Sequence, residues 1–245
     1  MGPSFIVMGA LMFILASPAI FLPYTLNPKD SGYLPYGYQT EEGTGTKRVI
    51  KKANWDNFSL THVSFILLAL FTLLHTSLTG IPQHFPGFAE TIQLSPQVGG
   101  VMLSAVMVGN ISFKLMTGFI SDYIGITKAT LLIIVINFIA TILLLTLSHP
   151  YLLIMAAFLF GSVYSIPSVS LPLLTTEFFG MERYVQLFPI ISFVGGIGGA
   201  LSMSAVGYVF DFTHSYMPAL IAALIFHVCN SVIITLAKRQ SSHLT

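Results

Sequence analysis

A lysine inside an apolar segment is the residue of this sequence best placed to bind an ion. Lys114 lies in the apolar run that we expect to span residues 97–119, about six residues or roughly 9 Å of helix rise from its end. A charged group at that depth usually faces a protein interior or a water-filled cavity. Alternatively, the lysine side chain extends along the helix so that its ammonium group reaches the membrane surface. Asn110, one helical turn earlier, could add a hydrogen bond.

Two further residues in apolar segments are candidates for the same site. His75 is titratable and could relay protons, or it could simply hydrogen-bond a neighbouring helix. Tyr164 precedes Pro167, whose missing N–H kinks a helix and frees a backbone carbonyl. Tyr164 could line a substrate path or could pack against its neighbours. We therefore take both as substrate-binding candidates.

A short polar turn follows Lys114 and is the candidate moving part. It holds Gly118, Asp122 and Gly125, in the sequence GFISDYIG. Glycine allows backbone angles that other residues avoid and lets helix ends approach closely. The Asp122 carboxylate could accept hydrogen bonds from the free N–H groups at the start of another helix. The alternative is an ordinary turn with no such role.

No pattern in the sequence indicates an enzyme. The histidines lack metal-ligand spacing, and there is no glycine-rich loop for ATP, zinc-protease motif or hydrolase nucleophile motif. We expect no metal, no cofactor and no nucleic-acid partner. Cys229 is the single cysteine and lies in an apolar run, so no disulfide can form within the chain.

The composition indicates an integral membrane protein. Charged residues make up 8% of the 245 residues, against roughly 25% in soluble domains. Hydrophobic residues make up 54% and the mean hydropathy is +0.83. So few charges could not cover the surface of a water-soluble domain of this size. The lipid bilayer is therefore the first expected partner.

Seven apolar runs are long enough to cross a bilayer as helices. We predict an all-α membrane protein with spans at about 4–26, 60–80, 97–119, 127–147, 151–173, 187–210 and 217–237. A first helix within 1–26 is followed by a Gly- and Pro-rich loop at 27–59, a six-helix region at 60–238 and a tail at 239–245. No basic residue precedes the first run, which argues against a cleaved signal peptide.

The positions of the Lys and Arg residues predict the orientation of the chain in the membrane. All ten lie in or near alternate connections, where positive charge marks the cytoplasmic side. They are Lys29, Lys47, Arg48, Lys51 and Lys52 in the long loop, Lys114 and Lys128 near 120–128, Arg183, and Lys238 and Arg239 in the tail. We predict a cytoplasmic C-terminus and an N-terminus outside, in a plasma membrane.

The turn at 118–125 resembles a helix-connecting motif of the major facilitator superfamily, G-x-x-x-D-x-x-G. One helix, a long basic loop and six closely joined helices also resemble the second half of a twelve-helix member, its helices six to twelve. This resemblance implies a six-helix half-bundle and alternating access around a central site. It also implies that Asp122 contacts the start of the span at 187–210, although Tyr123 stands where the family has Arg or Lys. A separately encoded first half, or a second copy of the chain, would complete such a transporter.

The longer pattern N-x-x-x-K-x-x-x-G-x-x-x-D at 110–122 resembles the oxalate:formate antiporter and monocarboxylate transporter branch. The resemblance implies that Lys114 contacts a substrate carboxylate. Asn110 stands where proton-coupled carriers have an acid, and the span at 187–210 has no second cation. A single carboxylate, as in a small organic anion, therefore fits better than a dicarboxylate.

Small residues in the span at 187–210 predict close helix packing. Gly195, Gly199 and Gly207 are the packing candidates, and a gliding surface for alternating access is the alternative. Two other functions stay open on the sequence. One is a seven-helix receptor, although the long loop after the first span and the lack of paired cysteines speak against it. The other is a non-transporting membrane remnant that packs with partners.

Overall fold

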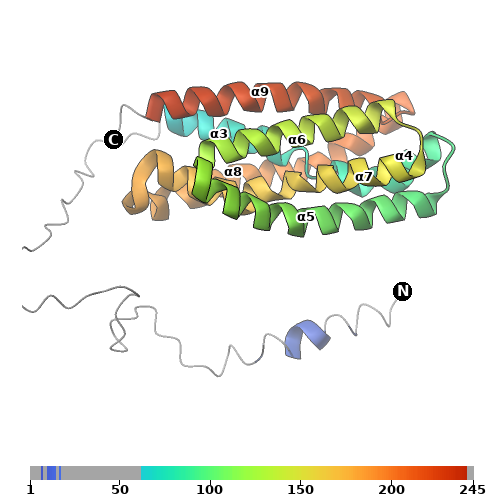
Figure 1. Ribbon diagram of the computed structural model, residues 1–245, viewed down its shortest axis with the longest axis horizontal. Coiled ribbons are helices and arrows are strands. Elements are labelled where there is room, and N and C mark those ends of the chain that lie inside the picture. Colours follow the sequence, from blue (N-terminus) through green and yellow to red (C-terminus); the bar gives the residue numbers. More distant parts are fainter. Residues whose placement is uncertain (1–6, 8–9, 15–16, 18–61, 242–245) are drawn as a thin grey trace, which may run out of the picture. The chain divides into compact units, whose positions relative to one another are not determined.

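The computed structural model describes residues 7, 10–14, 17 and 62–241 (Figure 1). The chain divides into two units, residues 1–52 and residues 53–245. In the first unit, residues 10–14 are helical. The rest of the predicted span at 4–26, and the predicted loop at 27–59, lie outside the described residues. The second unit, described from residue 62, contains only helices, turns and short connections.

Six segments of the second unit are long and apolar enough to cross a membrane. The first span comprises α3 (Val63–Thr76), η3 (Ile81–His84) and α4 (Phe85–Thr91). Next come α5 (Pro96–Ile124) and α6 (Ile126–Thr146). The fourth span comprises α7 (Pro150–Phe160), η4 (Gly161–Tyr164), η5 (Ile166–Ser170) and the start of α8 (Leu171–Thr213). The remainder of α8 and α9 (Met217–Ser241) complete the six. The predicted all-α fold is confirmed for this part of the chain.

Proline and glycine set the helix ends. Pro96 and Pro150 occupy the first turns of α5 and α7, where a missing N–H leaves no hydrogen bond unmade. Gly125 has φ 83° and separates α5 from α6, and Gly180 has φ 78° and interrupts α8. These positive angles favour glycine, so both sharp reversals depend on this residue type.

Several connections differ from the prediction. Gly118 and Asp122 lie inside α5, so the predicted turn at 118–125 is reduced to Gly125 alone. Much of the expected loop at 81–96 is helical, and the expected loop at 174–186 is helical apart from the break at Gly180. The reason is that polar residues lower the hydropathy of a segment without ending its helix. Pro82 and Pro86 lie in the first turns of η3 and α4, where a missing N–H leaves no helical bond unmade.

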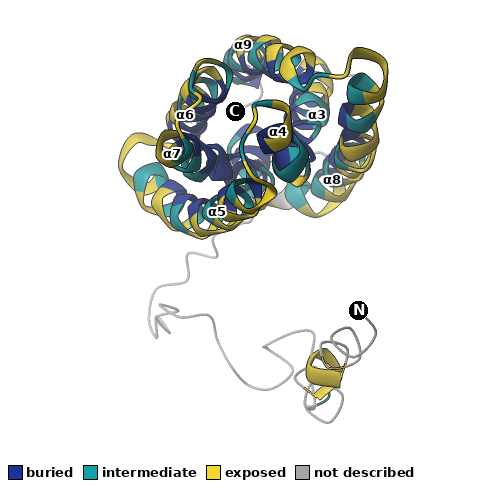
Figure 2. Ribbon diagram, turned by 90° about the vertical axis from the view of Figure 1, so that its right-hand side faces the viewer, coloured by how far each residue is buried: buried dark blue, intermediate teal, exposed yellow. Residues whose placement is uncertain are grey.

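The six spans form a bundle, seen end-on in Figure 2. On one side α7 lies between α5 and α6, and on the other α3 packs against both α8 and α9. α6 and α9 join the two sides. α5 and the part of α8 beyond Gly180 are the least buried spans. They leave broad apolar surfaces for lipid or for another part of a larger assembly.

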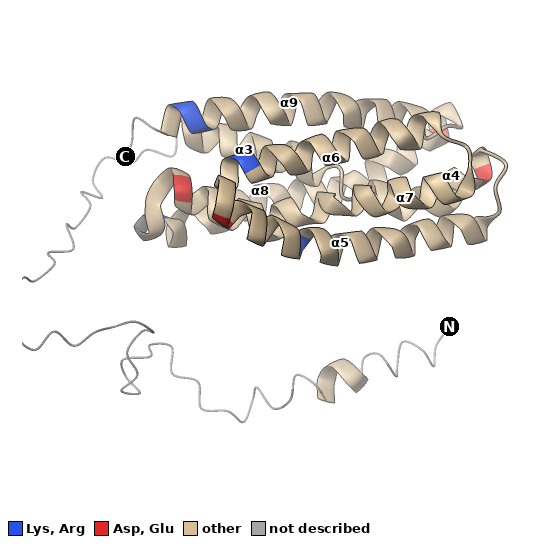
Figure 3. Cartoon of the chain, in the orientation of Figure 1, with Lys and Arg blue, Asp and Glu red and all other residues tan. Residues whose placement is uncertain are grey.

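Charged residues gather at the two ends of the bundle (Figure 3). Among the described residues, Lys128 and Lys238 lie at the end where α6 begins and α9 finishes. There Lys238 Nζ lies 2.7 Å from Glu177 Oε1, and the hydroxyl of Thr127 donates to Glu177 Oε2 at 2.7 Å. This contact ties α6, α8 and α9 together at one end. Lys114 lies deeper, on α5.

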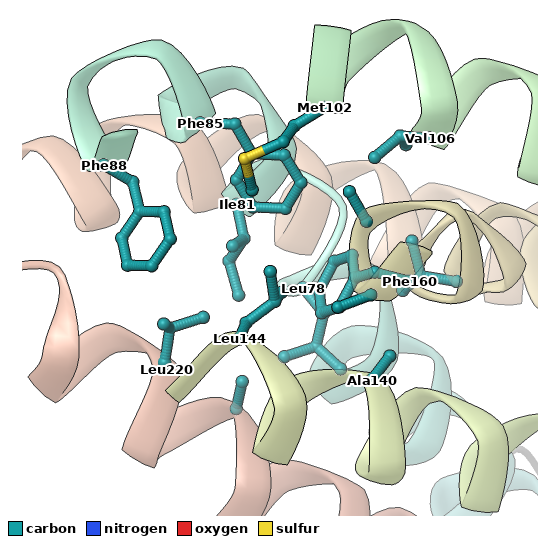
Figure 4. Close-up of a cluster of buried hydrophobic side chains, with 14 of the residues drawn as sticks. Leu78, Ile81, Phe85, Phe88, Met102, Val106, Ala140, Leu144, Phe160 and Leu220 are labelled. Carbon is teal, nitrogen blue, oxygen red and sulfur yellow. The ribbon is translucent and has the colours of Figure 1, made fainter. Parts of the chain in front are cut away.

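The apolar core is divided into two clusters. The first, at the end of the bundle near α4, includes Leu78, Phe85, Met102, Val106 and Phe160 (Figure 4). The second lies toward the cation-bearing end and includes, among others, Phe71, Phe113, Ile134, Ile191 and Ile234. The residues between the two clusters form the site described next.

Candidate functional site

Buried polar residues separate the two apolar clusters. On α3, Thr72, His75 and Thr76 lie between Phe71 of one cluster and Leu78 of the other. Other spans repeat the arrangement. We call the following set the central polar layer: Thr72, His75 and Thr76 on α3, Asn110 on α5, Asn137 and Thr141 on α6, Tyr164 and Ser165 at the end of η4, Ser192 on α8, and His227 and Asn230 on α9. Burying polar groups is costly unless they are paired or functional, so this layer is the candidate site.

The fourth span is interrupted within this layer. After α7 the chain forms the 3₁₀ turn η4 and then the π-helical turn η5. Pro167 has no N–H to donate to the carbonyl of Val163, four residues earlier. His75 Nε2 takes this place and donates to the Val163 oxygen at 2.9 Å. Because a carbonyl oxygen can only accept, the bond fixes His75 in the tautomer protonated on Nε2.

The first span is interrupted at the same level. Between α3 and η3 the chain passes through Ser77 and Gly80, and Ser202 of α8 reaches into the gap. The backbone N–H of Gly80 donates to Ser202 Oγ at 3.0 Å, and the Ser202 hydroxyl donates to the Ser77 carbonyl. A Cβ on Gly80 would lie 2.6 Å from the backbone nitrogen of Met203, so this approach requires glycine. Side chains of α8 thus replace the missing intrahelical hydrogen bonds.

The two interruptions also contact each other. The Tyr164 hydroxyl of the fourth span donates to the carbonyl of Thr79 in the first span at 2.8 Å. His75 makes the opposite contact, from the first span to the fourth. Interrupted helices at the membrane midplane are where transporters place their substrate sites. The mutual contacts therefore mark this junction as the candidate binding site.

A pocket of about 280 Å³ lies at this junction. It is lined by Thr72, Thr76 and Thr79 of the first span, Tyr164, Pro167 and Leu171 of the fourth span, and Ser192, Gly195 and Gly196 of α8. None of these residues is charged. A smaller hollow behind it reaches His75 and shares Thr72, Thr76, Pro167 and Leu171 with it. The site is thus concave and mostly apolar, with a few hydroxyl groups, as small-molecule sites usually are.

The structure separates the four predicted substrate-binding residues into two pairs. Tyr164 lines the pocket and His75 lies directly behind it. Asn110 and Lys114 lie on α5 and are not among the lining residues. Asn110 faces the fourth span closely, since a Cβ on Gly161 would lie 2.8 Å from its backbone nitrogen. Its Oδ1 is buried without a hydrogen-bond partner among the described residues.

Lys114 is half-buried and lies farther from its helix end than the sequence predicted. α5 continues to Ile124, so Lys114 lies ten residues, or about 15 Å of helix rise, from that end. No acidic side chain forms a salt bridge with it in the part of the chain that the structure describes. Its ammonium group is therefore available to an anion from outside this bundle.

The predicted conformational motif is placed at the end of α5. Asp122 is exposed there, and within residues 62–241 it makes no salt bridge. A Cβ on Gly118 would have no neighbour within 4 Å. Gly125 is conformationally required by its positive φ. The contact between Asp122 and the start of the span at 187–210 stays a prediction.

The three predicted packing glycines have different surroundings. A Cβ on Gly195 would lie 2.7 Å from Thr72 Cγ2, so its hydrogen permits the close approach of α8 to α3. At Gly199 and Gly207 the nearest atoms would lie 3.7 and 3.8 Å away, which is ordinary contact. Gly198 is more crowded than either, with the Leu73 carbonyl oxygen at 2.5 Å. The tight packing therefore centres on Gly195 and Gly198.

Most residues of the pocket were not predicted from the sequence. Thr72 and Thr76 are spaced by one helical turn and Thr79 follows, so a hydroxyl stripe on one face of an apolar span was the available signal. Ser192 gave no such signal. Asn137, His227 and Asn230 could have been noticed as single polar residues at the middle of three predicted spans. Among the described residues, no cluster of three or more His, Cys, Asp or Glu could hold a metal.

Six apolar spans with a buried polar middle, two of them interrupted beside a pocket, define a multi-pass membrane protein of the transporter class. The sequence profile of the Major Facilitator Superfamily matches residues 2–203, and the chain belongs to this family. Membership indicates a membrane transporter of small solutes, which is not an enzyme class. No curated protein matches the chain.

Proposed function

We propose that the chain acts as the second half of an alternating-access transporter for small organic anions. The observation that carries the proposal is the pocket at the junction of the two interrupted spans. In a six-helix half built from three-plus-three inverted repeats, the first and fourth spans occupy equivalent positions. Their interruptions lie at one level and contact each other through Tyr164 and His75. Such a junction can hold a substrate while the surrounding helices rock.

Lys114 supplies the preference for anions in this proposal. It is half-buried on α5, and an ionisable group within a membrane span usually faces the bundle interior or a water-filled cavity. A positive charge without an acidic partner in the described bundle favours a carboxylate ligand. Asn110, one turn away, would add an amide hydrogen bond.

A complete substrate path requires a second half in the proposal. The exposed faces of α5 and of α8 beyond Gly180 would meet a first half, which is a separately encoded chain or a second copy of this one. Gly118, Asp122 and Gly125 would make and break contacts at the cytoplasmic end during the cycle. The cations near that end support a cytoplasmic C-terminus, and the proposal places the chain in a plasma membrane.

Uptake of radiolabelled acetate into proteoliposomes tests this function. The chain is reconstituted alone and together with a first half, each with the native sequence, Lys114→Ala and Lys128→Ala. Lys128 is an exposed lysine at the start of α6 and serves as a matched control. We expect uptake only in the presence of both halves, a loss of at least about tenfold for Lys114→Ala, and no change for Lys128→Ala. Uptake that survives Lys114→Ala would overturn the role of Lys114.

A further inference from the structure

The hydroxyl groups of the pocket already use their hydrogens inside the protein. Thr72 donates to the Leu68 carbonyl at 2.7 Å, and Thr79 donates to the Thr76 carbonyl at 2.7 Å. Tyr164 donates to the Thr79 carbonyl. A hydroxyl group has one hydrogen and two lone pairs. These three groups therefore have acceptor capacity left and no hydrogen to give.

Thr76 has the most electronegative surroundings of the lining residues. Its hydroxyl oxygen lies 2.8 Å from the Thr72 carbonyl, 3.2 Å from the Leu73 carbonyl and 2.8 Å from the Gly195 carbonyl. The one hydrogen of this hydroxyl is already shared among these carbonyl oxygens, so the Thr76 oxygen can accept a hydrogen bond and has no hydrogen to give. A donor group of a ligand can bond to it, whereas a carboxylate finds no donor there.

Few donors balance these acceptors. Pro167 has no N–H, and the N–H groups of the α3 and α8 residues that line the pocket lie within helices, where they serve the intrahelical bonds. Ser192 is the one lining hydroxyl for which the described residues offer no acceptor, so it can donate once. No lining residue carries a positive charge. The pocket therefore complements hydrogen-bond donors and does not complement a carboxylate.

We propose that this pocket binds the hydrogen-bond-donating end of the substrate, a hydroxyl or ammonium group, through Thr72, Thr76 and Thr79. The proposal rests on the function proposed above and refines its substrate class. The function proposed above assigns the carboxylate of the same molecule to Lys114 on α5, and the donor group then binds to Thr72, Thr76 and Thr79. The preferred substrate is then a small carboxylate that also carries a donor, in preference to a plain alkyl carboxylate.

Three ligands of almost equal size test whether the pocket prefers a carboxylate that carries a hydrogen-bond donor. Acetate carries a methyl group where glycolate carries a hydroxymethyl and glycine an ammoniomethyl group. Binding is measured as ligand-induced thermal stabilisation of the purified full chain, which rises with ligand concentration over Kd. We expect glycolate or glycine to bind about tenfold more tightly than acetate, as one or two hydrogen bonds would provide. Which of the two binds more tightly identifies hydroxyl or ammonium as the donor.

Variants of similar shape show which pocket residues cause the preference for donor-bearing ligands. Thr72→Val and Thr79→Val remove the acceptor oxygens and keep the shape. Each should reduce the preference to about twofold or less by weakening glycolate and glycine more than acetate, while Thr79→Ser should retain the preference. Thr146→Val is the matched control, because Thr146 makes the same bond to a carbonyl one turn earlier, at 2.9 Å, but on an exposed surface. Equal binding of all three ligands, no binding by any, or a preference that persists in both valine variants would overturn the proposal.

Glycolamide and acetamide separate this inference from the proposed function. Both lack the carboxylate, and only glycolamide carries the hydroxyl. If glycolamide binds more tightly than acetamide and Lys114→Ala changes no affinity, the donor pocket stands and the anion role of Lys114 fails. If Lys114→Ala weakens glycolate and acetate alike and no donor preference exists, the inference fails and the proposed function stands.

Discussion

The two sides of the bundle, at and near the central polar layer, use their buried polar side chains differently. On the pocket side, His75, Tyr164 and Ser202 each bond to a backbone group at an interrupted helix. On the side formed by α6 and α9, Asn137, His227 and Asn230 lie on uninterrupted helices and are fully buried. Their side chains keep atoms without a hydrogen-bond partner among the described residues.

The α6–α9 side is only partly connected. Thr141 donates to the Asn137 carbonyl at 2.8 Å, so His227 Nε2, at 3.3 Å from Thr141 Oγ1, must donate to that oxygen. His227 Nδ1, Asn137 Oδ1 and both polar atoms of the Asn230 side chain have no partner within residues 62–241. On these uninterrupted helices the side-chain bonds to backbone stay within one helix, as in the bond from Asn137 Nδ2 to the Ile133 carbonyl at 3.0 Å, and none of those described joins two helices through a backbone group.

The helix interruptions give polar side chains a structural role. A helix that loses backbone hydrogen bonds in a membrane must recover them from neighbouring helices or water. The pocket side recovers them from side chains distant in sequence, and that exchange holds the pocket walls in place. Variants on the two sides should therefore change stability by different amounts.

The largest effect is expected for Ser202→Ala. This change leaves both the Gly80 N–H and the Ser77 carbonyl without a partner. Losing the partner of a buried polar group costs about 1–3 kcal/mol, so we expect about 2–3 kcal/mol for the pair. Thermal unfolding in detergent measures the loss. Ser204→Ala, at an exposed position two residues later, is the control, and equal losses from both variants would remove the distinction between the two sides.

The next effect is a coupling between His75 and Pro167. His75→Ala should cost about 1–3 kcal/mol, because the Val163 carbonyl loses its donor. In a Pro167→Ala background the new N–H can bond the same carbonyl, so His75→Ala should cost at least about 1 kcal/mol less there. A double-mutant cycle of unfolding free energies measures this coupling. Additive losses would show that His75 stabilises the chain by some other contact.

A smaller effect is expected on the α6–α9 side. Asn230→Leu replaces an amide that has no described partner by an apolar group of similar size. Such a replacement is often neutral or stabilising, so we expect a change within about 1 kcal/mol in either direction. The same unfolding measurement applies. A loss of more than about 2 kcal/mol would mean that water or another partner satisfies Asn230, and the contrast with Ser202 would fail.

The smallest effect is expected outside the polar layer, for Glu177→Gln. The pair of Glu177 and Lys238 is 30% and 43% exposed, and exposed ion pairs contribute about 0–1 kcal/mol. We expect a loss of less than about 1 kcal/mol that shrinks further as salt is added. Unfolding at low and high ionic strength measures it. A larger, salt-independent loss would mean that this ion pair stabilises the protein as much as the contacts around the pocket do.

The membrane spans could be predicted from the sequence, whereas the interruptions could be predicted only in part. Hydropathy identifies spans because every backbone group in lipid must be bonded internally. Pro167 indicates a kink by its chemistry. That His75 would bond the freed carbonyl, or that Ser202 would enter the gap at Gly80, depends on residues about 90 and 120 positions away. The length of helix after Lys114 was underestimated because Ser121 and Asp122 lower the hydropathy of α5 without ending it.

The joint at Gly125 limits how the bundle can move. It is the single residue between α5 and α6, and one residue extends the chain by at most about 3.8 Å. Sliding one helix past the other by a full turn would require about 5.4 Å. The two helices therefore have too little slack to change register. If α5 moves along the bundle axis and carries Lys114 with it, α6 must therefore move in the same direction.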